Sequence, residues 1–351
     1  MKILKYLFFL LLIIFIGASI YIATKDGSYQ VQEQRMIAAP QEVLYDEVND
    51  LTTWKEWEPW SNGAEDMIIN YGDKTVGEGA NYEWSSEEMG DGSLVTTKAN
   101  PHGSIEQQVT FKTTFGESTS DISWSFEKQN DSILTTWTLK GDQTFLEKAA
   151  FLFENESMTQ RLQPVFKQGL DNLEEQIRKE IESYSINVDG VTQHGGGYYL
   201  YITTASRLSQ IADKMQDMTN DVSNFMNSNN IEMTGKPFIL FNERNEDRGT
   251  AIYSAAYFTP SEVITPQDSQ VLNGFMPNQK TLKTTLKGDY EYLQEAWDAA
   301  YQYIQENDLL IMEDAEFFQV HVTGPKDNAN PAEWITHLYI PLGEKETALD
   351  D

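Results

Sequence analysis

The first 28 residues constrain the chain most, because they contain a long segment without a charged side chain. No Asp, Glu, Lys or Arg occurs from Tyr6 to Ala23, and most of these residues are Leu, Ile or Phe. As a helix the segment is about 27 Å long, close to the thickness of the hydrocarbon core of a bilayer. Its apolar residues favour insertion by roughly 4 to 7 kcal/mol. The sequence therefore predicts one membrane-spanning helix at residues 6–23.

A cleaved signal peptide is the alternative, because positive residues before an apolar core are typical of both. The apolar run is longer than the usual signal core of roughly 7 to 15 residues, and the Gly-Ala-Ser sequence at 17–19 lies inside it. An uncleaved anchor is therefore favoured. Lys2 and Lys5 precede the span, and only Lys25 closely follows it. The positive-inside rule then predicts a single-pass protein with a cytoplasmic N-terminus and soluble domains outside the cytoplasm.

The composition excludes several classes of function. Acidic residues outnumber basic ones by 55 to 25, and the formal charge of −30 disfavours nucleic acid as a partner. The absence of cysteine excludes disulfides, thiolate metal sites and a cysteine nucleophile. The four histidines lack the spacing of metal ligands, and the HGGG sequence at 194–197 lacks the Lys-Ser/Thr of a phosphate-binding loop. We therefore predict no catalytic residue, metal or cofactor.

Residues 29–183 show one strand, a short helical patch, a series of strands and one long helix. Alternation indicates a strand at residues 29–38, and three further strands are expected between residues 104 and 140. From Ser157 to Ser183, apolar residues recur at three- and four-residue steps. This spacing predicts an amphipathic helix of about seven turns. Its single apolar face needs a sheet to cover it.

This order of elements resembles the helix-grip fold of the SRPBCC superfamily, which includes START domains and polyketide cyclases. The resemblance implies an antiparallel sheet curled around the long helix, with an apolar pocket between them. Packing is one role for the tryptophans in this region, and lining the pocket mouth is the other. The residues that carry the resemblance are Ala39-Pro40, the cluster Trp54, Trp57 and Trp60, the Gly77-x-Gly79 turn before Tyr82 and Trp84, and Thr135-Thr136-x-Thr138.

Residues 184–351 contain a repeat in which the order strand, helix, strand, strand occurs twice. The first unit covers residues 197–258 and the second covers residues 280–341. Residues 229–242 align without gaps on residues 308–321, which pairs Phe238 with Phe317. Two such units are expected to form a shared groove, and concave seams of this kind are where ligands bind.

The same region resembles the GyrI-like effector-binding domain, a small-molecule sensor also found attached to transcription regulators of the AraC and MerR types. The residues behind the resemblance are Gly288-x-Tyr290, Trp297, the strand Phe318 to Val322 leading to Pro325, and the closing run Trp334-x-Thr336-x-Leu338-Tyr339-Ile340-Pro341. The sequence as a whole therefore predicts an α+β protein. A transmembrane segment (1–28) precedes a helix-grip domain (29–183) and a duplicated GyrI-like domain (184–351).

The strand AEFFQVHV, residues 315–322, carries the main candidates for ligand binding. In the GyrI-like family this strand holds a Glu and, two residues later, often a Tyr, and the carboxylate attracts cationic aromatic ligands. Gln319 and His321 stand at these positions, so the resemblance implies a neutral or weakly acidic ligand rather than a cation. Hydrogen bonding to neighbouring strands is the alternative role for both. The aromatic candidates, each equally suited to the core, are Trp297, Tyr253 and Tyr339.

Three functions are compatible with these patterns. The first is a membrane-anchored, non-catalytic binding protein for small hydrophobic or amphipathic molecules. The second is a hydrolase or cyclase with His321 as general base, which the missing Glu disfavours. The third is an interaction protein of the cell envelope that binds no ligand. The first is the hypothesis that we carry forward.

Overall fold

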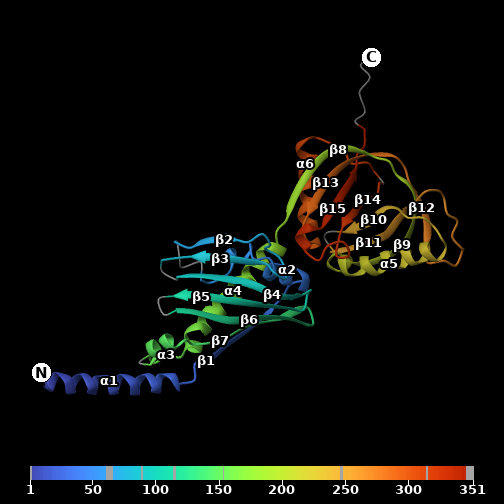
Figure 1. The fold of residues 1–351 in the computed structure, drawn as a ribbon. Coiled ribbons are helices and arrows are strands. Elements are labelled where there is room, and N and C mark those ends of the chain that lie inside the picture. Colours follow the sequence, from blue (N-terminus) through green and yellow to red (C-terminus); the bar gives the residue numbers. More distant parts are fainter. Residues whose placement is uncertain are drawn as a thin grey trace, which may run out of the picture. The chain divides into compact units, whose positions relative to one another are not determined.

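The computed structural model describes residues 2–60, 66–87, 90–113, 116–152, 154–245, 248–313 and 315–344. The chain separates into two compact units, Met1–Glu180 and Ile181–Asp351. Each unit contains one large antiparallel sheet (Figure 1). The predicted α+β class with two antiparallel sheets is therefore confirmed, whereas the assignment of each predicted domain to a family is a separate question.

Helix α1 (Lys2–Ala23) forms the N-terminal segment. It is long and apolar enough to cross a membrane, and its apolar stretch is not buried against the protein. A signal sequence shares these properties, so anchoring and topology stay predictions.

The first unit is built on a seven-stranded antiparallel sheet in the order β1-β7-β6-β5-β4-β3-β2. The predicted long helix is α4, and it spans Met158–Ile181. Shorter helices are α2 (Gln41–Asn49), η1 (Trp54–Glu56) and α3 (Phe145–Phe151). The strands are β1 (Ser28–Ile37), β2 (Ile68–Tyr71), β3 (Asn81–Ser85), β4 (Asp91–Asn100), β5 (Ser104–Thr113), β6 (Gly116–Gln129) and β7 (Ser132–Asp142).

Aromatic side chains fill the space between this sheet and α4. Trp124 and Trp137 stack with their ring centroids 4.5 Å apart, and Trp57 meets Trp124 edge-on at 5.9 Å. A Cβ atom on Gly169 of α4 would lie 2.7 Å from the Trp137 ring, so glycine is what allows the helix to approach the sheet this closely. The core of the first unit is thus a tryptophan cluster.

The three tryptophans singled out from the sequence belong to this region. Trp54 and Trp57 are buried in the cluster, whereas Trp60 is only partly buried at its edge. Trp54 donates its indole N–H to the carbonyl oxygen of Val48 at 2.9 Å. Packing therefore accounts for Trp54 and Trp57, and contact of any of the three with a ligand stays a prediction.

The second unit is built on an eight-stranded antiparallel sheet in the order β12-β9-β11-β10-β14-β15-β13-β8. Helix α5 (Ile211–Ser228) follows the short helix η3 (Leu208–Gln210), and α6 (Leu293–Glu306) follows η4 (Tyr290–Tyr292). The short helix η5 (Pro331–Glu333) precedes the last strand. The strands are β8 (Ser185–His194), β9 (Gly197–Arg207), β10 (Thr234–Asn245), β11 (Thr250–Thr259), β12 (Leu272–Met276), β13 (Gln279–Lys287), β14 (Phe317–Thr323) and β15 (Ile335–Pro341).

The predicted gapless alignment of the two repeats is out of register by one residue. Phe317 packs on the helix-facing side of the sheet with Trp297, whereas Phe238 packs on the opposite face with Tyr199 and Phe318. Because side chains alternate along a strand, a slip of one residue reverses every side chain. Phe238 therefore lies on the same face of the sheet as Phe318 and not on that of Phe317. The duplication itself stays a prediction.

Glu47 of α2 gives the first unit a predictable dependence on pH. Its side chain is buried, and its Oε1 atom has no hydrogen-bond partner among the described residues. Burial, together with the negative charges of Glu180, Asp50 and Glu56, raises its pKa from 4.5 to about 7. Because folding raises this pKa, the contribution to stability is present in acid and is lost as the pH rises through about 7.

The variant Glu47→Gln should therefore stabilise the first unit by about 2 kcal/mol at about pH 8 and by much less at about pH 4. Urea unfolding followed by tryptophan fluorescence would measure this, since six of the eight tryptophans lie before residue 180. Glu83→Gln, at an exposed position of β3, is the control and should change stability by less than about 0.5 kcal/mol. A pH-independent effect of Glu47→Gln would contradict the prediction.

Candidate functional site

The second unit contains a cavity with a volume of about 1020 Å³. Its walls come from η3 and α5, from η4 and α6, from strands β10 and β14, and from the segment that follows β14. The side chains that line it are largely apolar and include Ile211, Met215, Phe241, Tyr290, Trp297 and Trp334. The cavity therefore lies on the helix-facing side of the sheet, where two amphipathic helices leave part of the sheet uncovered.

Two polar side chains of β14 lie in the cavity wall. Gln319 is 1% exposed and His321 is 6% exposed, and both line the cavity. The Nε2 atom of Gln319 lies 3.1 Å from the Nε2 atom of His321. With the amide in this orientation Gln319 donates, so Nε2 of His321 accepts and its proton is on Nδ1. That Nδ1–H has no hydrogen-bond partner among the residues that the structure describes.

Burial lowers the pKa of His321 from 6.5 to about 4, so the imidazole is neutral at physiological pH. The ring of Tyr290 meets it edge-on, with centroids 5.0 Å apart and an angle of 84°. Burial raises the pKa of Tyr290, which therefore keeps its phenolic proton. A Cβ atom on Gly324 would lie 2.6 Å from the Tyr290 hydroxyl oxygen, so the glycine leaves room for this ring. The part of the cavity wall formed by Gln319, His321 and Tyr290 is therefore polar but uncharged.

A positive charge lies beside the aromatic wall of the cavity. The guanidinium carbon of Arg244 is 5.4 Å from the ring centroid of Trp297 and 5.5 Å from that of Phe241. Its Nη2 also donates to the side-chain oxygen of Gln294. Cation–π contacts of this kind occupy the face of an aromatic ring that a cationic ligand would otherwise use.

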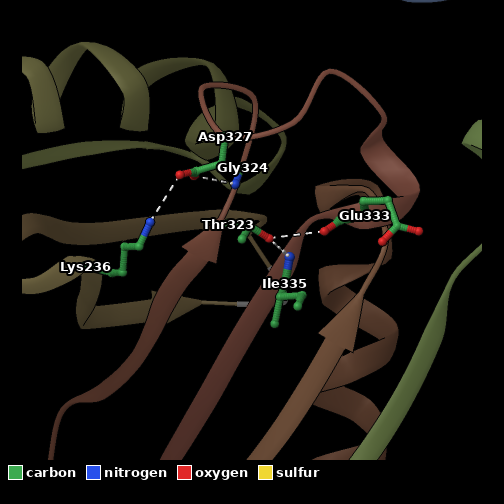
Figure 2. A network of polar contacts seen from close by, with 6 residues as sticks. All are labelled: Lys236, Thr323, Gly324, Asp327, Glu333 and Ile335. Carbon is green, nitrogen blue, oxygen red and sulfur yellow. Dashed lines mark hydrogen bonds and ion pairs between the residues drawn. The ribbon is translucent and has the colours of Figure 1, made fainter. Parts of the chain in front are cut away.

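A network of polar contacts holds the segment after β14 in place (Figure 2). The carboxylate of Asp327 accepts the backbone N–H of Gly324 at 3.1 Å and pairs with the ammonium of Lys236 on β10 at 3.1 Å. The hydroxyl of Thr323 accepts the backbone N–H of Ile335 at 2.8 Å and donates to the carbonyl oxygen of Glu333 at 3.1 Å. This wall of the cavity is therefore fixed to β10 on one side and to β15 on the other.

The structure brings three of the five predicted ligand-binding residues together at the cavity, namely Gln319, His321 and Trp297. Tyr253 is fully buried in the core, with its hydroxyl 3.2 Å from that of Ser206, and it does not line the cavity. Tyr339 lies on the opposite face of the sheet, where it stacks on Phe318 at 4.8 Å. Ligand binding by the three residues at the cavity stays a prediction.

Arg244 and Tyr290 are two of the site residues that the sequence did not indicate as candidates. Tyr290 was part of the family resemblance, but its contact with His321 joins η4 to β14 and leaves no trace in local sequence. Arg244 lies in the polar sequence NERN at the end of β10, where periodicity does not show which side chain turns toward Trp297.

One comparison with known proteins matches a defined region of the chain. Residues 198–342 match the family model of the GyrI-like small molecule binding domain. All of the residues that line the cavity, from Leu208 to Trp334, fall within these bounds. The second unit therefore contains a GyrI-like small molecule binding domain. A comparison with curated proteins found no match.

Several solved structures are distantly similar to the chain. A protein from Chromobacterium violaceum has a TM-score of 0.33 and 13% identity, and the match covers 42% of this chain and 96% of that one. The C-terminal domain of EcmrR has a TM-score of 0.40 and 13% identity, and the match covers 46% of this chain and 99% of that one. The structure of SAV2435 bound to tetraphenylphosphonium has a TM-score of 0.33 and 12% identity, and the match covers 46% of this chain and 94% of that one.

The low pKa of His321 predicts that the second unit loses stability in acid. Because folding lowers this pKa, the contribution is fully present above about pH 6.5 and is lost as the pH falls toward about 4. The free energy of unfolding should fall by about 3 kcal/mol over this range, and His321→Phe should remove most of that fall. Hydrogen exchange of the backbone amides of β10 and β14 would measure the free energy of unfolding of the variant and of the wild type at each pH.

The imidazole signals of the four histidines in NMR spectra provide a direct check. The signal that disappears in His321→Phe should titrate near pH 4. A midpoint above about pH 6, close to the value of an exposed histidine, would contradict the burial of His321 in the folded protein.

Proposed function

We propose that the chain is a membrane-anchored binding protein for small hydrophobic or amphipathic molecules, which it holds in the cavity of the second unit. The observation that carries the proposal is a cavity of about 1020 Å³ whose lining combines apolar and aromatic side chains with polar and charged ones. Sites for small molecules commonly have volumes of roughly 300 to 1,000 Å³ and this kind of lining. The match of residues 198–342 to a small molecule binding domain supports the same conclusion.

The charges around the cavity favour a neutral or weakly acidic ligand over a cation. Gln319 is an amide where the related domains carry a carboxylate, and the unpaired Nδ1–H of His321 is suited to an acceptor atom of the ligand. The positive charge of Arg244 already lies over Trp297. The lining holds three carboxylates, Asp289, Glu291 and Asp327. Two of them are engaged by local partners, since Asp327 pairs with Lys236 and Asp289 accepts the backbone N–H of Glu291 at 2.9 Å.

The remaining parts of the proposal concern the rest of the chain. The apolar, unburied helix α1 supports anchoring, and the lysines on its N-terminal side support a cytoplasmic N-terminus. An antiparallel sheet packed on α4 supports the assignment of residues 29–183 to the helix-grip fold. The mirrored strand orders β9-β11-β10 and β14-β15-β13 support an internal duplication.

Two observations favour binding over the alternative functions. A general base works best when its pKa is close to the operating pH, whereas the pKa of His321 is about 4 and its Nε2 atom accepts from Gln319. Any step in a pH-rate profile that depends on His321 should therefore lie near pH 4. An interaction protein without a ligand would not need a cavity of this volume.

The first test is whether the cavity captures a molecule. The full chain in detergent is incubated with a lipid and metabolite extract, repurified and analysed by mass spectrometry. We expect hydrophobic molecules to co-purify with the wild type and severalfold less with Met215→Trp, which fills the cavity from α5. Phe225→Trp, on the same helix but outside the lining, is the matched control. Empty wild-type protein, or equal recovery with Met215→Trp, would refute the proposal.

The second test is the charge preference, and it uses two ions of the same shape. Tetraphenylborate is expected to bind the wild type more tightly than tetraphenylphosphonium in calorimetric titrations. Gln319→Glu should raise the affinity for tetraphenylphosphonium by about tenfold, which is about 1.4 kcal/mol. Gln279→Glu places a carboxylate at another buried glutamine of this unit, outside the cavity, and should not. If the wild type binds tetraphenylphosphonium more tightly than tetraphenylborate, the proposed preference against cations is wrong.

A further inference from the structure

The short helix α3 exposes large apolar side chains that packing within the first unit does not use. None of its residues is buried, and Phe145 is 45% exposed and Leu146 is 50% exposed. A surface helix of a water-soluble domain normally turns its apolar side chains toward the core. Here the two bulkiest groups of the first turn face away from it, which calls for an apolar environment outside the unit.

Helix α3 lies directly beside the end of α1 (Figure 1). The ammonium of Lys148 donates to the carbonyl oxygen of Lys25 at 2.8 Å, two residues after α1 ends. The backbone N–H of Gln143 donates to the carbonyl oxygen of Gly27 at 2.9 Å. Where α1 crosses a bilayer, residues 23–25 mark its surface, so these two bonds place α3 at the depth of the lipid headgroups.

Basic and aromatic groups surround α3 in the combination that membrane interfaces favour. The ammonium of Lys25 is 4.5 Å from the ring centroid of Tyr21, and the guanidinium of Arg161 is 4.9 Å from that of Phe151. The nearby carboxylates are engaged within the protein. Glu147 accepts the backbone N–H of Thr144 at 2.6 Å in a capping box.

Two further carboxylates near α3 also have local partners. Glu154 pairs with Arg161 at 2.6 Å, and Asp26 accepts the backbone N–H of Ser28 at 2.9 Å. Near α3, the ammonium groups of Lys25 and Lys148 can attract anionic lipid headgroups, whereas these carboxylates are held by partners within the protein.

We propose that α3 is a second membrane contact, in which Phe145 and Leu146 insert into the boundary between headgroups and acyl chains of the leaflet beside the end of α1. The inference rests on the anchoring of α1 in the proposed function and adds a surface to it. One transmembrane helix leaves a domain free to rotate and tilt about its linker. A second contact on α3 holds the first unit in one orientation relative to the bilayer.

The absence of native cysteine allows a direct test with single labelled positions. Leu146→Cys in the full chain is labelled with the environment-sensitive fluorophore NBD and reconstituted in vesicles of phosphatidylcholine and phosphatidylglycerol. Quenching is then measured with lipids that carry a doxyl group near the headgroup. We expect a blue-shifted emission and severalfold stronger quenching at Leu146→Cys than at Ile68→Cys. Ile68 is an exposed residue of β2, at the opposite edge of the sheet from β1.

A third label, Ile13→Cys in α1, measured with lipids that carry the doxyl group deep in the acyl chain, separates the inference from the anchoring on which it rests. Quenching at Ile13→Cys without quenching at Leu146→Cys would refute the contact of α3 and leave the anchor intact. No quenching at Ile13→Cys would refute the anchor and the inference together. Equal quenching at Ile68→Cys would show unspecific contact with lipid and would also refute the inference. Phe145→Cys repeats the measurement, so a poorly folded Leu146→Cys does not decide the outcome.

Discussion

The register between β10 and β14 is the constraint on which the candidate site depends. Ile239 pairs with Gln319, and Leu240 pairs with Phe318, at the centre of the eight-stranded sheet. Because side chains alternate, this register turns Gln319 and His321 toward the helices and Phe318 toward the other face. The apolar clusters on both faces oppose any slip, since a shift of one residue would exchange the two sets of side chains. Core packing and site geometry are therefore specified by the same contacts.

The cavity wall at Gln319 and His321 carries no charge, although the protein as a whole is strongly acidic. The formal charge of −30 attracts cations to the surface in general, but screening at physiological ionic strength limits that attraction to about 8 Å. Selection inside the cavity then depends on the groups that touch the ligand. The neutral pair Gln319 and His321 and the positive charge of Arg244 act at that range.

Periodic patterns predicted the fold where a single face of an element is apolar. The helix expected over residues 157–183 spans Met158–Ile181, and the strand expected over residues 315–322 overlaps β14 (Phe317–Thr323), one face of which lines the cavity. Contacts between distant elements were not predictable in this way. Arg244 reaches Trp297 across the groove, and the stacking of Tyr339 on Phe318 depends on which face β15 presents.

The alignment of Phe238 with Phe317 failed for a related reason. Both are aromatic residues within apolar strands, and identity of side chains does not record which face of the sheet they occupy. The resemblance to the GyrI-like domain pointed to β14 and to Gln319 and His321, and both of these side chains line the cavity.

The pairing of β1 with β7 has a mechanical consequence. β1 begins at Ser28, five residues after the end of α1, and its first register pair joins Ser28 to Asp142. Where α1 is held in a bilayer, any tension between the membrane and the first unit acts on this pair before the others. The ten pairs of the β1–β7 ladder would then open one after another from that end. The bonds from Lys148 to Lys25 and from Gln143 to Gly27 lie just ahead of it and take up the load first.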